Sequence, residues 1–380
     1  MSFYCSEKFT FLTVDIEKRL LYSCCSASPE KVDLNWLKQN STQLFNTPLI
    51  QSERQDMLNN ISVASCESNC WRPERNNITS RRIWLKKDQI THTDIQTASP
   101  TKLNINLGSN CNLTCSYCCK QYSSAWKRDI IINGSYINHN RFNVTPQDHI
   151  LLKISQNEHI TSPSHQLLID AISSFDKVKE IAISGGEPFL YNSLDALLDT
   201  FKDVNTQIYT GLGVNPTRFK NQLLKIKNKQ KVTMIVSSEN CNQFYEFNRY
   251  GNSWEQFLVN LTELQEQGFR IIFSSVISNL TIFGLLNFIE KFSDIEIKYN
   301  WCNDPDFLGV NVLDDTSKKY LIDQISSTSI QIKDHLITSI EQSYTEEQRQ
   351  NFSRYITEFA RRRNLSLAIY PEHMLQWLNE

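Results

Sequence analysis

The chain has 380 residues, and its 39 lysines and arginines nearly balance its 41 aspartates and glutamates, for a formal net charge of -2. This balance gives no support to a nucleic-acid or anionic-membrane partner, because both bind to basic surfaces. The one basic run, 361–363, is interpreted as a solvated helix end rather than a phosphate site.

The N-terminal segment predicts a small cysteine-rich module over residues 1–85. The stretch "FTFLTVDIEKRLLYSCC" alternates as a β-hairpin does, and "TPLIQSERQDMLNN" has a helical pattern. The first residues lack a basic segment followed by an apolar run, and no stretch of about 18 apolar residues occurs, so we predict a cytoplasmic protein with no membrane span. In a reducing compartment, clustered cysteines favour metal binding or catalysis over disulfides.

From residue 102 onward, short apolar runs alternate with helical patterns. The runs are "LNINL", "EIAISG", "TQIYTG", "VTMIVS", "RIIFSSVI" and "IEIKYNW", which begin at residues 103, 180, 206, 232, 270 and 295. Strands alternating with helices predict an α/β fold with a parallel sheet or a partial barrel, whose active site lies at the carboxyl ends of the strands. Residues 119–163 interrupt the alternation as an insertion loop, and residues 315–380 have helical patterns.

Three cysteines follow the first of these predicted strands at the spacing C-x3-C-x2-C. They are Cys111, Cys115 and Cys118, within "CNLTCSYCC". A structural zinc site needs four protein ligands, whereas three thiolates on one loop leave a coordination position open and suit an iron-sulfur cluster.

This loop resembles the cluster loop of the radical S-adenosylmethionine (SAM) superfamily. Tyr117, just before the third cysteine, fits that pattern, and Cys119 would be a bystander. The resemblance implies a partial (β/α)6 TIM-like barrel over residues 100–312, a 4Fe-4S cluster held by the three cysteines, and SAM chelated to the exposed iron. The residue patterns predict a small N-terminal β-hairpin and helix module at 1–85 and a helical C-terminal extension at 313–380.

A glycine pair in a glycine-poor chain supports the resemblance. Gly185, Gly186 and Glu187 follow the second strand in "AISGGEPFL", which is similar to the GGE motif of that superfamily. Glycines let backbone approach a ligand closely, and a carboxylate accepts from an ammonium group. The alternative is an ordinary turn.

Two later segments are also similar to SAM-binding regions of the superfamily. In the first, the resemblance implies that Ser237 and Glu239 hold the ribose and that Arg249 holds the methionine carboxylate, a group that suits bidentate arginine. A surface salt bridge for Arg249 and a helix cap for Ser237 are the alternatives. In the second, the resemblance alone places backbone near Val276 and Asn279 against the adenine.

Four separated cysteines in the N-terminal module resemble the ligands of the twitch or SPASM modules, which carry auxiliary iron-sulfur clusters. They are Cys5, Cys24, Cys66 and Cys70, with Cys25 as an alternative to Cys24. Such modules usually follow the barrel, whereas this one precedes it. Four thiolates also fit a structural zinc site, and the cysteine pattern does not distinguish the two metals.

The resemblance therefore implies an enzyme that cleaves SAM reductively and abstracts hydrogen from a substrate C–H bond. We predict oxidation or modification of a small polar metabolite or sugar; the alternatives are a ribosomal-peptide maturase (crosslinking or epimerisation) and a non-catalytic iron-sulfur or zinc protein. A flavodoxin- or ferredoxin-type donor would supply the electron. Cys302, after the sixth strand, is a candidate hydrogen donor, although free cysteine is more often a small buried hydrophobe. The substrate, product and oligomeric state are left open.

Overall fold

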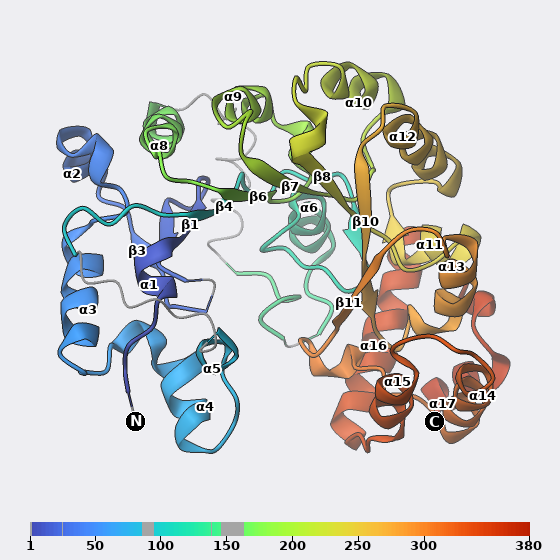
Figure 1. The fold of residues 1–380 in the computed structure, drawn as a ribbon. Helices are drawn as coiled ribbons and strands as arrows, with labels where there is room; N and C mark the ends of the chain where they lie inside the picture. The colour runs from blue at the N-terminus through green and yellow to red at the C-terminus, as the bar shows by residue number, and fades with distance from the viewer. Residues whose placement is uncertain (1, 25, 86–94, 138, 146–162) are drawn as a thin grey trace. The chain divides into compact units, whose positions relative to one another are not determined.

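The computed structural model describes residues 2–24, 26–85, 95–137, 139–145 and 163–380, and Cys25 therefore lies outside the described residues. The chain divides into two compact units (Figure 1). Unit 1 comprises residues 1–108, 158–208 and 225–233, and unit 2 comprises residues 109–157, 209–224 and 234–380. The predicted domain boundaries remain a prediction.

Unit 1 is built on a mixed sheet in which a parallel part is continued by an antiparallel part. Its strand order is β7-β6-β4-β1-β2-β3. The pairs β1 with β4, β4 with β6 and β6 with β7 are parallel, whereas β2 pairs antiparallel with both β1 and β3. The strands are β1 (Phe11–Asp15), β2 (Leu20–Tyr22), β3 (Glu30–Lys31), β4 (Lys102–Asn106), β6 (Glu180–Ser184) and β7 (Asn205–Thr210, of which the last two residues belong to unit 2).

The predicted N-terminal hairpin is confirmed as β1 and β2, and β1 in addition extends the parallel sheet. Leu12 faces Leu103, and Leu103 faces Ile181 in the next strand. All three side chains are buried, as expected for a strand with neighbours on both sides. The helices of unit 1 are α1 (Glu7–Thr10), α2 (Leu34–Gln39), α3 (Pro48–Leu58), α4 (Arg72–Arg75), α5 (Arg81–Trp84), α8 (Pro163–Ser173) and α9 (Ser193–Thr200).

Unit 2 combines the later strands with most of the helices. Its strands are β5 (Thr114–Cys115), β8 (Val232–Ser237, whose first two residues belong to unit 1), β9 (Arg249–Tyr250), β10 (Arg270–Ile277) and β11 (Ile297–Trp301). The helices are α6 (Ser124–Asn133), α10 (Pro216–Leu223), α11 (Asn242–Asn248), α12 (Trp254–Glu266), α13 (Leu285–Lys291), α14 (Asp315–Ser326), α15 (Lys333–Glu341), α16 (Glu346–Arg363) and α17 (Glu372–Asn379). Strands β10 and β11 pair in parallel, and β5 pairs antiparallel with β9.

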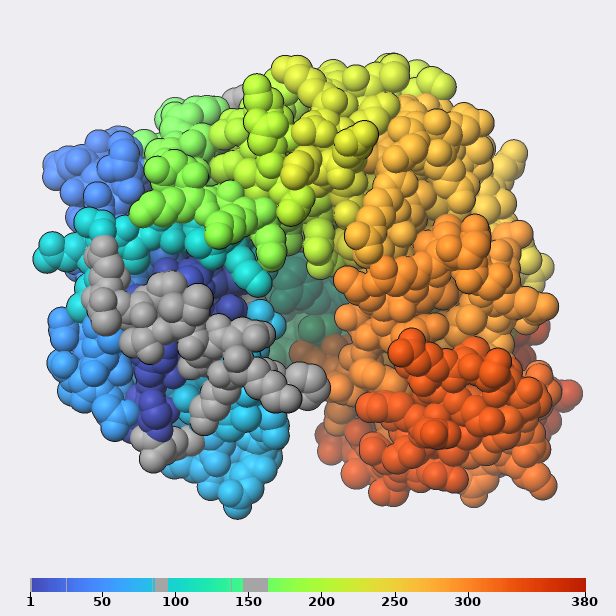
Figure 2. All heavy atoms as spheres, viewed as in Figure 1, coloured from blue at the N-terminus to red at the C-terminus, as the bar shows by residue number. Residues whose placement is uncertain are grey.

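The predicted fold class is confirmed: the protein is mixed α/β with a largely parallel sheet and a helical C-terminal region. Each of the six strands predicted between residues 103 and 301 is present. Figure 2 shows the side chains of the C-terminal helices, in red, as one closely packed surface. In the part of the chain that the structure describes, no helix has both the length and the apolar character needed to cross a membrane.

The interpretation of residues 361–363 as a solvated helix end is wrong for two of the three arginines. Arg361 is exposed, whereas the Arg362 and Arg363 side chains are each 4% exposed. The guanidinium of Arg363 donates to Thr114 Oγ1 at 2.9 Å and stacks 3.9 Å from the ring of Phe359. The last turn of α16 also directs Arg362 inward, where it pairs with Glu358 and lies 3.8 Å from the ring of Tyr136.

Candidate functional site

The C-x3-C-x2-C loop lies in unit 2 and is fixed mainly through its backbone. Cys115 pairs with Arg249 across the β5–β9 ladder. The carbonyl of Cys115 accepts from Trp126 Nε1 at 2.9 Å and from the Cys118 amide at 3.0 Å. The phenol of Tyr355 donates to the carbonyl of Ser116. Backbone bonds of this kind hold the loop that carries the three thiols.

The thiols themselves lie in a desolvated environment. Cys115 is buried, and Cys111 and Cys118 are partly buried. Burial raises the pKa of the Cys118 thiol well above its usual value, and the negative charges of Cys119, Cys115 and Cys111 act in the same direction. The Leu113 amide lies 3.4 Å from Cys111 Sγ and donates to it. A bound cation would offset the charge of three ionised thiols here, so their chemistry fits a thiolate-ligated metal centre.

Beside Cys115 lies a buried group of charged and aromatic side chains. Arg249 Nη2 pairs with Glu239 Oε2 at 2.9 Å, and the two side chains are 3% and 0% exposed. The phenol of Tyr117 donates to both oxygens of Glu239 at 3.1 Å. Burial raises the pKa of Tyr117, so the phenol stays protonated and can donate. Arg249 Nη1 lies 3.9 Å from Cys115 Sγ.

The surface-salt-bridge alternative for Arg249 is thus ruled out by burial, and one of its donors is left over. Arg249 Nε is buried and has no hydrogen-bond partner among the described residues. A buried guanidinium with a spare donor next to a thiol can bind a carboxylate, because that anion would accept the hydrogen bond from the orphaned N–H.

The other predicted SAM-binding residues of unit 2 differ in what they can offer. Ser237 is partly buried at the end of β8. The carbonyl of Val276 accepts from Thr281 Oγ1 at 2.7 Å. Asn279 is buried and donates its amide hydrogens to the carbonyls of Phe307 and Val312, while its Oδ1 has no partner among the described residues. The side chain of Asn279 therefore holds the 307–312 loop and keeps one acceptor spare.

The GGE turn lies in unit 1, at the carboxyl end of β6. Gly185 and Gly186 both have positive φ, of 108° and 40°. A Cβ on Gly185 would lie 2.8 Å from the backbone of Gly108, so glycine is needed for the close approach of two neighbouring strand ends. Glu187 is 1% exposed, and its Oε1 accepts from the amide of Phe189 at 3.4 Å. This local turn function exists whether or not Glu187 binds a ligand.

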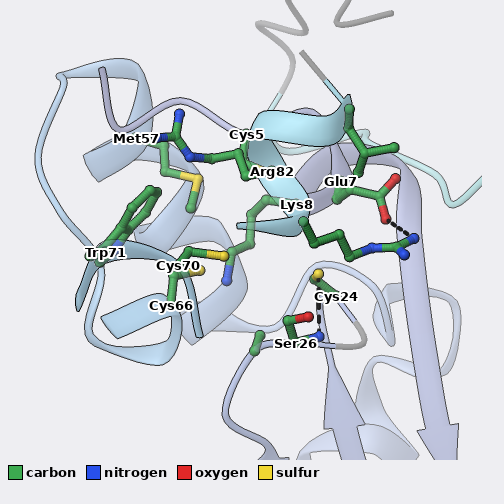
Figure 3. A pocket seen from close by; sticks show the side chains of 13 residues that line it. Cys5, Glu7, Lys8, Cys24, Ser26, Met57, Cys66, Cys70, Trp71 and Arg82 are labelled. Carbon is green, nitrogen blue, oxygen red and sulfur yellow. Dashed lines mark hydrogen bonds and ion pairs between the residues drawn. The ribbon is translucent and has the colours of Figure 1, made fainter. Parts of the chain in front are cut away.

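A second set of thiols lies in unit 1, where one pocket is lined by all four predicted cysteines: Cys5, Cys24, Cys66 and Cys70. Figure 3 shows their side chains, with the Cys66 and Cys70 sulfurs next to each other. Each cysteine comes from a different turn: before α1, after β2, and in two consecutive short helical turns, Ala64–Cys66 and Glu67–Trp71. Sequence separations of up to 65 residues are therefore closed by the fold.

Burial also governs the thiols of this pocket. It raises the pKa of Cys5 to about 11 and also raises those of Cys66 and Cys70. Cationic side chains line the same pocket, among them Lys8 and Arg82. Four desolvated thiols beside cations fit a thiolate-bound metal centre. As the side chains stand, no group of three His, Cys, Asp or Glu residues in the described ranges is arranged to hold a metal ion.

Several residues that hold these thiols carry no signal in the sequence. Trp126 and Tyr355 support the 115–118 turn, and Lys8 and Ser65 lie beside the N-terminal cysteines. Each is a single residue outside any motif. Cys302, by contrast, was predicted; it is 7% exposed, and burial raises the pKa of its thiol to about 12.

One protein family model matches part of this chain. Residues 105–291 match the family model described as the radical SAM superfamily. No curated protein sequence matches the chain.

Three solved structures are among those to which the chain is similar. The chain is 14% identical to anSMEcpe with bound AdoMet, covering 68% of this chain and 60% of that one with a TM-score of 0.36. It is 16% identical to Streptococcus suis SuiB bound to precursor peptide SuiA (96% and 71% covered, TM-score 0.34) and to TYW1 with a lysine-pyruvate adduct (50% and 61% covered, TM-score 0.28). The chain thus spans about three fifths of the length of anSMEcpe. TM-scores this low carry no argument about the family, and the support for it is the match over residues 105–291.

Proposed function

We propose that this chain, whose residues 105–291 contain a domain of the radical SAM superfamily, is an enzyme that uses the thiols of Cys111, Cys115 and Cys118 to cleave SAM reductively. A 4Fe-4S cluster with SAM, when bound, supplies the electron that splits SAM into methionine and a 5′-deoxyadenosyl radical, which takes hydrogen from a substrate C–H bond. The observation that carries the proposal is that these three thiols lie inside the matched segment, on a loop fixed by its backbone.

The roles of the unit 2 residues are proposed from the hydrogen bonds that their side chains make or can still make. Arg249 holds the methionine carboxylate with the donor that the protein leaves unpaired, and Glu239 keeps the arginine oriented through its 2.9 Å contact. Ser237 and Glu239 bind the ribose, and Val276 and Asn279 border the adenine. The assignment of Gly185, Gly186 and Glu187 to the amino group of SAM remains a prediction.

The substrate is proposed to be a small polar metabolite or sugar, which would be oxidised or otherwise modified. The near-neutral charge supports this over a polyanion, as does the burial of Arg362 and Arg363 in the core. Cys302 is the proposed hydrogen donor where the substrate radical is reduced. Its raised pKa keeps the thiol protonated, and the thiyl left behind would regain an electron and a proton from the flavodoxin- or ferredoxin-type donor.

The four cysteines of unit 1 are proposed to hold a second 4Fe-4S cluster, as a twitch- or SPASM-like module does. The shared pocket supports this, because four thiolates saturate such a cluster and leave no open position. Cys24 lines the pocket and is the proposed fourth ligand, and its alternative, Cys25, lies outside the described residues.

The test is anaerobic reconstitution followed by measurement of iron, sulfide and 5′-deoxyadenosine formed from SAM with dithionite. The parent protein should bind about eight irons, four per cluster, and cleave SAM. A variant with Cys111, Cys115 and Cys118 all changed to Ala should bind about four irons and lose cleavage. Cys119→Ala is the matched control, because Cys119 belongs to the same stretch and is buried.

Two results would contradict the proposal: no cleavage by the parent protein, or cleavage retained by the triple variant. The substrate class is tested in the same assay. A pool of polar metabolites should raise 5′-deoxyadenosine formation above its background, whereas stimulation by peptides alone would make the protein a peptide-modifying enzyme.

A further inference from the structure

A buried lysine connects the segments that carry the unit 1 cysteines. Lys8 is 1% exposed, and its ammonium donates to Ser23 Oγ at 2.6 Å, Glu53 Oε2 at 2.6 Å and Ser65 Oγ at 3.0 Å. An ammonium has three N–H donors, so these acceptors use all of them. Ser23 and Ser65 directly precede Cys24 and Cys66 in the chain, and Lys8 follows Cys5 in α1. One cation therefore lies on one cysteine-bearing segment and contacts two others.

The direction of the hydrogen bonds at Ser65 follows from the donor inventory. Ser65 Oγ lies 3.9 Å from Cys66 Sγ, where either atom could be the donor. Because the Lys8 ammonium can only donate, the Ser65 oxygen accepts from it, and the hydroxyl hydrogen remains available. A thiolate can only accept. Once Cys66 is ionised, as a metal ligand must be, Ser65 donates to its sulfur.

We propose that Lys8 and Ser65 form a two-bond relay directed at Cys66, which stabilises the more negative, reduced state of the metal group held by the four cysteines. This inference rests on the four-cysteine site of the proposed function. Hydrogen bonds to ligand sulfurs and burial are two of the means by which a protein sets the potential of such a centre. Lys8 and Ser65 are positioning residues, since both act through Cys66.

The carboxylate beside Lys8 does not cancel its effect. Lys8 reaches Cys66 through Ser65, whose Oγ lies 3.0 Å from the Lys8 ammonium and 3.9 Å from Cys66 Sγ, whereas the hydrogen bond that Glu53 accepts in this group comes from Lys8. In a desolvated pocket the charge of Lys8 acts more strongly than it would in water. Figure 3 shows the Lys8 side chain extending toward the Cys66 and Cys70 sulfurs.

The experiment uses the full chain with Cys111, Cys115 and Cys118 changed to Ala, so that iron signals report on the four-cysteine site. The midpoint potential is measured by redox titration with electron paramagnetic resonance detection. Ser65→Ala should shift the midpoint to a more negative potential at unchanged iron content, and Ser65→Thr, which keeps a hydroxyl, should retain the parent value.

Ser23→Ala is the matched control. Ser23 accepts from the same ammonium but makes no hydrogen bond to sulfur among the described residues, so its removal should leave the midpoint unchanged. Lys8→Met combined with Glu53→Met, which avoids a stranded carboxylate, should shift the midpoint in the direction of Ser65→Ala.

The failures can be told apart. A midpoint in Ser65→Ala equal to that of Ser23→Ala would overturn the relay while the four-cysteine site stands. A background protein that binds no iron, or binds zinc with no reducible signal, would overturn both the site and the relay.

Discussion

Replacing Glu239 by Gln tests how much the buried pair with Arg249 contributes to stability. Both side chains are at most 3% exposed and their contact is 2.9 Å, so solvent screens the interaction little. Glutamine keeps one acceptor for Tyr117 but leaves the guanidinium charge uncompensated. Removing one partner of a buried pair costs about 3–5 kcal/mol. We expect a loss of that size in the free energy of unfolding, measured by urea denaturation of the metal-free protein.

The control is a pair of equal length on the surface of the same unit. Lys220 Nζ and Glu263 Oε2 are also 2.9 Å apart, but the lysine side chain is 55% exposed. Glu263→Gln should cost at most about 1 kcal/mol. Adding Arg249→Met to Glu239→Gln should recover part of the loss, because it removes the stranded charge. Equal losses for the two single variants, or a larger loss in the double variant, would refute the reasoning.

Two further predictions concern the cysteine loop and acid stability. Gly251 has φ 108°, and a Cβ there would lie 2.7 Å from the carbonyl oxygen of Asn112, so Gly251→Ala should cost about 1–3 kcal/mol more than Gly134→Ala and should lower iron retention. Gly134 has φ 83° with open space, so it isolates the backbone effect; equal losses would contradict this prediction. The hydrogen bond from Arg361 lowers the pKa of Glu358 to about 2, so its contribution is present above the unfolded pKa and is lost as pH falls toward 2. Glu358→Gln should therefore be less stable than the parent at pH 7 and nearly equal to it near pH 2 in thermal melts, and a gap that does not depend on pH would count against this.

The strands could be predicted because their signals are local. Apolar runs such as "VTMIVS" and the amphipathic stretches between them need no distant partner to be recognised. The parallel pairing of β1 with β4 could not be predicted, because Leu12 and Leu103 are far apart in the sequence and no local pattern identifies either as the partner of the other. The hairpin was evident, whereas its place in a larger sheet depends on the whole fold.

The same distinction applies to the site. Cysteine spacing predicted which thiols are candidate metal ligands, since metal ligands must be of a few chemical types. The groups that orient those thiols are of common types and come from anywhere in the chain: Tyr355 reaches Ser116 across 239 residues. For Arg362 and Arg363, the run of charges predicted exposure to solvent, and this prediction was wrong. The position of these two residues on the helix directs their side chains into an aromatic core.

In both thiol sets, a buried cation that is paired with a carboxylate lies near a cysteine. In unit 2, the buried cation Arg249 contacts Cys115 Sγ and is paired with Glu239. In unit 1, the buried cation Lys8 acts on Cys66 and is paired with Glu53. In the metal-free protein, the paired carboxylate compensates the charge of each cation, because an unpaired buried charge is costly.

The cation still stabilises negative charge on the neighbouring sulfur. A bound, reduced metal group would increase that negative charge. Each pair would thus suit a metal-loaded site without leaving an unpaired charge in the metal-free protein. Metal loading should reduce the stability lost in Glu239→Gln, because the three thiolates outweigh the positive charge of a 4Fe-4S core and leave a net negative centre beside Arg249. Urea denaturation of the reconstituted variant, compared with its metal-free form, measures that difference, and an undiminished loss after loading would mean that the cation does not act on the cysteines.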